Sequence, residues 1–233
     1  MKNPAYQVAR YASLLTAVGT LAAFGFALFA IPVSGANCPG DCISYPYLET
    51  ASQYPRDFLW MPLAGISLIS FLILLTAIDQ TAPENRKIYT SLARTFGTIS
   101  AAVLLVDYYL QFSVVPMSLI NQETEGLALL IQYNPHGIFL ILEELGYLLM
   151  SVSFGFLIPV FNAENARERA LRWIYRTAVI LAAGALFVIS IVFGLNRLDR
   201  FEVIIISINW LVLISTGFIL NRIYKNHVGR NHA

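Results

Sequence analysis

The feature that most constrains this chain is a set of long apolar runs without a charged side chain. Between Arg10 and Asp41 no Asp, Glu, Lys or Arg occurs, and residues 58–78, 177–196 and 203–221 are equally free of charge. Each run is close to the roughly 20 residues that a helix needs to cross a hydrocarbon layer of about 30 Å. Backbone groups inside lipid must find hydrogen-bond partners within the segment, which favours α-helices. We therefore expect these runs to be transmembrane helices.

Two further runs have the same length but contain acidic residues. They are residues 96–118 and 138–161. Only 12% of the side chains are charged and 57% are hydrophobic, whereas soluble domains usually carry about 25% charged residues. The sequence predicts an all-α, polytopic membrane helical bundle of about six transmembrane helices, forming a single domain over 1–233. The predicted helices cover residues 11–33, 58–78, 96–118, 138–161, 177–196 and 203–221.

The placement of Lys and Arg predicts the orientation, because cytoplasmic loops carry the excess of these residues. Of the 15 Lys and Arg residues, only Arg56, Arg197 and Arg200 fall on the predicted outer side, which leaves twelve on the other. The sequence therefore predicts a multi-pass protein of the cell (plasma) membrane with cytoplasmic N- and C-termini. We expect the basic connection 162–176 to form a surface helix against anionic headgroups.

The two cysteines, Cys38 and Cys42, lie in an Asn-Cys-Pro-Gly-Asp-Cys segment on the predicted outer side. Disulfides persist in that environment, and the Pro-Gly between the cysteines favours a tight turn. A redox motif of the Cys-x-x-Cys type is one residue shorter. A zinc site would need further Cys or His ligands nearby, and the loop has none. We expect a local disulfide that serves as a structural staple.

Three acidic residues fall within predicted spans, namely Asp107, Glu143 and Glu144. An ionised carboxylate at the bilayer centre costs about 2.5–3.5 kcal/mol even on insertion scales. These side chains must therefore face protein or water, pair with donors, or stay protonated. No predicted span contains a Lys or Arg that would neutralise them. Because Glu143 and Glu144 are adjacent, their side chains diverge by about 100° and point to different neighbours.

Other polar residues near these acids complete the candidate site. Gln111 follows Asp107 by four residues and Tyr147 follows Glu143 by four, so each pair shares a helix face. The polar residues Asn209 and Gln111 are by themselves more typical of hydrogen bonds between helices. A histidine beside a proline, like His136, is more typical of a cap. The candidate ligand- or proton-binding residues are Asp107, Glu143, Glu144, Gln111, Tyr108, Tyr147, His136, Asn209 and Trp210.

Several functional classes lack their signature. No span holds a lysine for a retinal Schiff base, and no His-Glu-x-x-His, Gly-x-Ser-x-Gly or P-loop motif is present. The sequence thus predicts no cofactor, no metal site and no nucleic-acid partner. The expected partners are the lipid bilayer and a small-molecule or lipid ligand, and a homodimer stays an option.

Three hypotheses about function remain, and whether the chain is an enzyme stays open. The first is binding or transport of a small molecule, cation or proton by the buried carboxyls. The second is an intramembrane enzyme on a lipid or isoprenoid substrate, with paired carboxyls as general acid and base. The third is a non-catalytic membrane subunit or sensor. Any site is expected in the outer half of the membrane, between the third, fourth and sixth helices, with residues 134–137 at its mouth.

Overall fold

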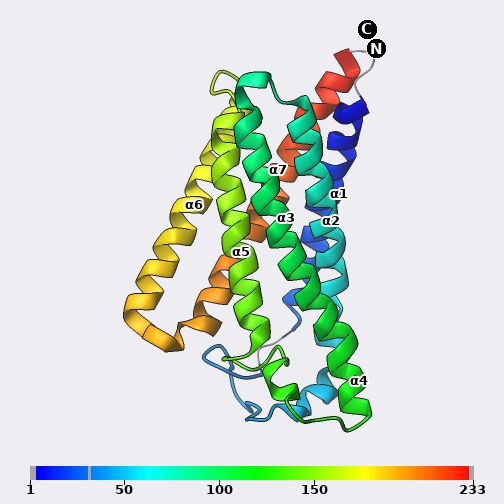
Figure 1. Ribbon diagram of the computed structural model, residues 1–233, viewed down its shortest axis with the longest axis vertical. Coiled ribbons are helices and arrows are strands. Elements are labelled where there is room, and N and C mark those ends of the chain that lie inside the picture. The colour runs from blue at the N-terminus through cyan, green and yellow to red at the C-terminus, as the bar shows by residue number, and fades with distance from the viewer. Residues whose placement is uncertain (1–3, 31–32, 231–233) are drawn as a thin grey trace.

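The chain forms an elongated bundle of long helices (Figure 1). The computed structural model describes residues 4–30 and 33–230, without the side chain of Arg230, and these residues contain helices and no strand. The all-α bundle that the sequence predicts is confirmed. The six long helices of the described residues are α1 Pro4–Ala27, α2 Trp60–Thr81, α3 Lys87–Tyr109, α5 Ile138–Leu157, α6 Ala166–Phe193 and α7 Leu198–Arg230.

The helices have the length and hydropathy of membrane spans. Five continuous helical stretches of the described residues are long and apolar enough to cross a membrane. The fifth, Ala166–Gly229, includes both α6 and α7, which are joined at η7 (Gly194–Arg197), where Asn196 leaves the helical backbone region. Figure 1 shows these two helices as a hairpin. Six long helices therefore occupy the places of the six predicted spans.

Helix packing separates a central group from one outlying helix. Helix α1 packs against α2 and α7, and α3 packs against α2 and α5. Helix α6 contacts α5 and α7 but exposes a broad apolar surface. Its exposed side chains include Ile180, Leu181, Phe187, Val188, Ile191 and Val192. A surface of this size and character requires lipid or another protein as its neighbour.

The start of α1 and the end of α7 lie at the same end of the bundle, here called the terminal end (Figure 1). Asn221 of α7 donates a hydrogen bond from Nδ2 to the Arg10 carbonyl of α1, at 2.7 Å. The ring of Tyr6 stacks on that of His227 with the centroids 5.2 Å apart. The opposite end, here called the distal end, holds the connections α1–α2, α3–α5 and α6–α7.

Several helix ends differ from those predicted. Helix α1 begins at Pro4 and ends at Ala27, so it lies earlier than the predicted 11–33; proline is favoured in a first turn because its missing N–H needs no partner there. The basic residues from Ala166 onward are not a separate surface helix but the start of α6, where the Asn165 side chain accepts a hydrogen bond from the Arg167 amide at 2.9 Å. Helix α7 begins at Leu198 rather than 203, which makes its first acidic residues helical.

The distal connections are packed onto the protein. Helix α3 continues through a π-helical turn, η4 (Leu110–Val114), into α4 (Val115–Ile120). Val115 of α4 forms a small second core with Leu127, Ile131 and Tyr133 of the following connection. In the α1–α2 connection, Cys38 and Cys42 form the disulfide that the sequence predicts, with their Cα atoms 6.1 Å apart.

The contact between α1 and α7 provides a test of this packing. A Cβ added to Gly217 would lie 2.7 Å from the Ser13 carbonyl oxygen and 2.8 Å from the Ala17 Cβ, and backbone cannot move aside easily. We expect Gly217→Ala to lower stability by about 1–3 kcal/mol, as overpacking does. The matched control is Gly184→Ala in α6, because a Cβ there meets nothing within 4 Å. Thermal unfolding in detergent should show a lower Tm for the first variant alone; equal Tm values would contradict the close contact between α1 and α7.

Candidate functional site

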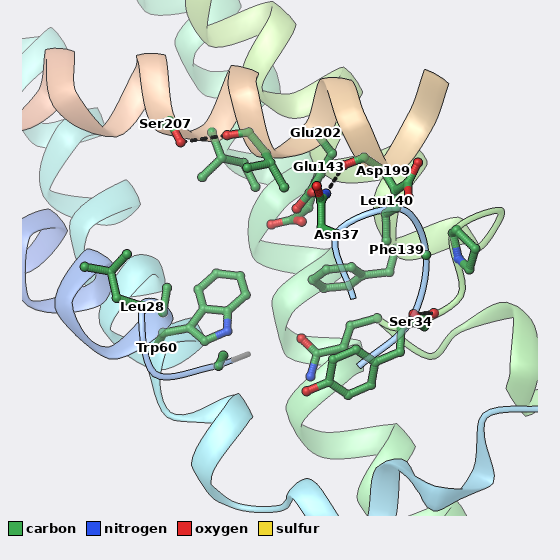
Figure 2. A pocket seen from close by; sticks show the side chains of 18 of the residues that line it. Leu28, Ser34, Asn37, Trp60, Phe139, Leu140, Glu143, Asp199, Glu202 and Ser207 are labelled. Atoms are coloured by element: carbon green, nitrogen blue, oxygen red, sulfur yellow. Dashed lines mark hydrogen bonds between the residues drawn. The ribbon is translucent and has the colours of Figure 1, made fainter. Parts of the chain in front are cut away.

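A cavity of about 400 Å³ lies at the distal end of the bundle. Residues from α1, α2, α5, α7 and two distal connections form its walls, and Figure 2 shows many of them. Helices α5 and α7, the fourth and sixth predicted spans, line the cavity, whereas α3, the third, contributes no lining residue. The lining residues that enter the argument are Phe24, Trp60, Tyr133, Phe139, Glu143, Asp199, Glu202 and Trp210.

The cavity is acidic and contains no basic side chain among the described residues that line it. Three carboxyl groups line it, from Glu143, Asp199 and Glu202. Asp199 already has partners, because its Oδ2 accepts a hydrogen bond from the Ala36 amide at 2.6 Å and its Oδ1 lies 3.4 Å from Arg200 Nη1. The two glutamates have no such cationic partner among the described residues. They form the chemical centre of the cavity.

The carboxyl groups of Glu143 and Glu202 lie within hydrogen-bonding reach of each other. Figure 2 shows them side by side, with Trp60 across the cavity. Glu143 is 1% exposed, and its Oε2 has no donor in the described structure. Two ionised carboxylates this close repel each other. The arrangement is therefore favourable when a proton is shared between them or when a cation lies beside them.

A chain of hydrogen bonds holds the other oxygen of Glu143. Trp210 Nε1 donates to the Tyr147 hydroxyl at 2.6 Å, the two tyrosine hydroxyls lie 2.7 Å apart, and Tyr108 donates to Glu143 Oε1 at 2.8 Å. Tyr108 has a single hydroxyl proton and gives it to Glu143, so Tyr147 must donate to Tyr108. This polarised relay links α7, α5 and α3 and aims its last donor at the Glu143 carboxylate.

Aromatic rings form the walls beside the acids. The Trp60 ring lies 5.7 Å from the Trp210 ring and 5.0 Å from that of Tyr108, measured between centroids. Phe24 packs edge-on against Trp210 at 5.7 Å, and Phe139 lies 6.2 Å from Tyr108. Ring faces attract cations through their quadrupole. Carboxyls and aromatic rings together make the cavity suited to a positively charged organic group.

Asp107 and Gln111 lie next to this site but do not line the cavity. Asp107 is 3% exposed, acts electrostatically on Glu143, and has one oxygen, Oδ2, without a donor in the described structure. Gln111 lies in the π-helical turn; with its amide oriented by the hydrogen-bond network, it donates to the Leu130 carbonyl at 2.7 Å and accepts from the Gln132 amide at 3.0 Å. Gln111 thus holds the distal connection that carries Tyr133.

Glu144 has a different partner from Glu143, as the angle between adjacent helical residues requires. Its Oε2 lies 2.5 Å from Arg197 Nη1 of the α6–α7 turn. Glu144 is therefore paired with a basic residue that lies outside the predicted spans, none of which contains a Lys or Arg. The physical reason is the length of the arginine side chain, which reaches along the helix from outside the apolar run.

Two other candidates lie away from the cavity. The side chain of His136 is exposed, and its backbone amide donates to Asn134 Oδ1 at 2.9 Å. Asn209 is fully buried and donates to the Ile205 carbonyl at 2.8 Å and to Ser151 of α5 at 3.1 Å. Asn209 therefore joins α7 to α5 by a hydrogen bond. Its neighbour Trp210 lies in the cavity wall.

The distal connections are anchored around the cavity by buried polar groups. Tyr133 donates to the fully buried Asp57, which also pairs with Arg56, and Ser34 donates to the Tyr133 carbonyl. Burial raises the pKa of the Tyr133 phenol well above its ordinary value, and the hydrogen bond to Asp57 raises it further. These contacts bring the α1–α2 connection and the α3–α5 connection together at the cavity.

Sequence reasoning misses Glu202, Asp199 and the pocket role of Trp60. The charges at residues 197–202 end the apolar run, and this pattern predicts a connection there. However, Glu202 and Asn209 are seven residues apart and so lie on one helix face. This spacing indicates that the helix begins before residue 203. Trp60 carries no such signal, since an aromatic residue at a helix end is equally typical of the membrane interface.

Comparison with known proteins adds no relative: no protein-family model, no curated protein and no solved structure matches this chain.

The Tyr133–Asp57 contact predicts a specific pH dependence. Tyr133→Phe leaves the buried Asp57 without one donor and should lower stability at neutral pH by about 1–3 kcal/mol. Because the folded protein holds the phenolic proton more tightly, the stabilisation is complete below about pH 10, the ordinary tyrosine pKa, and is lost as the pH rises further. The difference in Tm between the native chain and the variant should therefore shrink above that pH. Tyr45→Phe, at an exposed position of the same end, is the control; a Tm difference independent of pH would contradict the prediction.

Proposed function

We propose that this chain is a six-pass protein of the cell membrane, with both termini in the cytoplasm, that binds a small organic cation in exchange for a proton. The distal cavity would then face the outside. The observation that carries the proposal is the contact between the Glu143 and Glu202 carboxyls in a cavity lined by no basic residue of the described chain. The excess of Lys and Arg at the terminal end supports the orientation.

Charge balance favours exchange over simple binding. In the empty cavity one proton shared by Glu143 and Glu202 leaves a single negative charge on the pair. When a monovalent cation binds and the proton leaves, both carboxylates are ionised and the cation cancels one of them, so the total charge is unchanged. A process that keeps the buried charge constant avoids the cost of adding charge in a low-dielectric environment. Binding of the cation and release of the proton are thus coupled.

The residues that line the cavity favour an organic cation over an inorganic one. A cavity of about 400 Å³ falls within the range of about 300–1,000 Å³ that is usual for small-molecule sites. Trp60, Trp210 and Phe139 present rings beside the carboxyls, which suits an alkylammonium group with an apolar body. A divalent metal would prefer a shell of oxygen ligands instead.

The relay restricts the route of the proton. It ends at the indole of Trp210, which has no lone pair in its plane to accept a proton. The proton therefore enters and leaves Glu143 through the cavity and not through the relay. If the protein transports its ligand, the same carboxyl pair must be exposed to one side of the membrane and then to the other.

A second candidate function is an intramembrane enzyme on a lipid or isoprenoid substrate. The rim of the cavity includes Leu28 and Val203, which are 69% and 44% exposed and would face lipid. One protonated and one ionised carboxyl are the pair that general acid–base chemistry requires. Incubation with isoprenoid alcohols and chromatography of the extracts would test it; recovery of unchanged substrate would exclude this function for them.

Binding can be tested with benzyltriethylammonium, a quaternary ion that has no proton of its own, so any proton released comes from the protein. Calorimetric titration in two buffers of different ionisation enthalpy measures that proton. We expect about one proton per cation for the native chain, and for Glu202→Gln no proton and at least tenfold weaker binding, because one of the two charges that attract the cation is lost and unit charges about 4 Å apart near a protein surface attract by about 4 kcal/mol.

The matched control for this titration is Glu123→Gln, an exposed acid at the same end of the bundle. It removes the same charge far from the carboxyl pair and should bind like the native chain. Proton release that persists in Glu202→Gln, or cation binding without any release in the native chain, would contradict the exchange.

Transport needs a separate measurement. In proteoliposomes with a pH-sensitive dye inside, an inward gradient of benzyltriethylammonium should drive protons out and raise the internal pH. Glu143→Gln should abolish this rise, whereas Glu123→Gln should keep it. Binding with proton release but no change in internal pH would restrict the function to binding.

A further inference from the structure

The terminal end of the bundle carries a cluster of arginines on the first turns of α6. Arg169, Arg172 and Arg176 follow one another at spacings of three and four residues, so they share a helix face. Together with Trp173 and Ala163 they line a depression of about 210 Å³. This arginine cluster is far from the carboxyl pair along the bundle, and the proposed function does not use it.

The guanidinium groups of the cluster are only partly engaged within the protein. Arg169 donates from Nε to the Ala163 carbonyl at 2.9 Å, and Arg176 lies 5.4 Å from the centre of the Trp173 ring. Arg172 is partly buried and, among the described residues, makes no hydrogen bond or ion pair. A guanidinium has five N–H donors, and leaving them without acceptors in a partly desolvated place costs free energy.

The acidic residues nearby do not neutralise the cluster. The Glu168 carboxylate accepts a hydrogen bond from the backbone amide of Asn162 at 2.6 Å. Glu164 is exposed in the preceding connection, and only its backbone carbonyl contacts Arg169, at 3.5 Å. No ion pair of the described residues includes a member of the cluster. The depression therefore keeps its positive charge.

The position of the cluster along α6 matches the level of lipid headgroups. One turn after Arg176 the exposed side chains become apolar, beginning with Ile180 and Leu181. At about 1.5 Å per residue, Arg172 lies about 12 Å from Ile180 along the helix. Trp173 is 59% exposed, and tryptophan is enriched at this boundary between headgroups and acyl chains. An occupant of the depression would thus have a charged head and an acyl chain beside α6.

We propose that the arginine cluster binds the phosphate group of an anionic phospholipid, such as phosphatidylglycerol, with its acyl chains against the apolar face of α6. The planar guanidinium of Arg172 donates two parallel hydrogen bonds to phosphate oxygens, and Arg169 and Arg176 add charge on either side. A zwitterionic phosphatidylcholine carries its own ammonium group, which the three arginines repel.

Trp173 provides the readout, because it is exposed whereas Trp60 and Trp210 are 7% and 3% exposed. The full chain is placed in phosphatidylcholine nanodiscs that contain a minor fraction of brominated phosphatidylglycerol or, in parallel, of brominated phosphatidylcholine with the same acyl chains. Bromine quenches nearby tryptophan fluorescence. We expect brominated phosphatidylglycerol to quench more strongly. In Arg172→Gln its enrichment should fall about fivefold, since each basic residue near a charged membrane surface contributes on the order of that factor.

Two further variants keep the test decisive. Arg172→Lys retains the charge without the planar fork and should give an intermediate enrichment. Arg222→Gln removes the same charge from an exposed position of α7 at the same end and should quench like the native chain. Equal quenching by the two lipids in the native chain would overturn the proposal. An equal loss in Arg222→Gln and Arg172→Gln would overturn it too, since the preference would then reflect overall charge.

Discussion

A carboxyl group buried among apolar helices is tolerated only if donors, a shared proton or a cation offset its desolvation. Among the buried acids of the long helices in the described chain, this constraint is most demanding at Glu143, because the side chain is 1% exposed. One of its oxygens accepts from the relay through Tyr108, and the other meets Glu202. The relay that ends at Glu143 joins α3, α5 and α7, so it fixes the register of these three helices in the distal half.

Two other buried acids, Asp79 and Glu144, each have an arginine partner, and this partner distinguishes them from the carboxyl pair. Asp79 lies 3.0 Å from Arg94 and accepts from Thr90 at 2.5 Å, at the terminal end. Glu144 pairs with Arg197 at the distal end. In both places an arginine near a helix end reaches the acid while its charge stays near water. Glu143 and Glu202 have no such partner in the described chain, and this absence suits them to an exchangeable proton or cation.

Sequence reasoning finds the three acids of the predicted spans, and it separates Glu143 from Glu144 by helical geometry alone. It cannot find Glu202, because one charged residue just outside an apolar run looks like part of a loop. Whether such a residue faces solvent or a neighbouring helix depends on where α7 begins, and α7 begins at Leu198 because the α6–α7 turn is tight. From the sequence, Gln111 and Asn209 could either belong to a site or make hydrogen bonds that hold segments together. In the structure both make hydrogen bonds that hold segments together.

The sequence by itself determined that this chain is a bundle of apolar helices, because hydropathy and helix length are local properties and lipid leaves the backbone no other partner. It also determined the Cys38–Cys42 staple, whose two ends are only four residues apart. Only the tertiary structure decided that the acids of α5 and α7 meet, that Trp60 of α2 faces them, and that α3 lies behind them. Those outcomes depend on the rotation of each helix about its axis, which the packing of all the helices sets together and no single apolar run specifies.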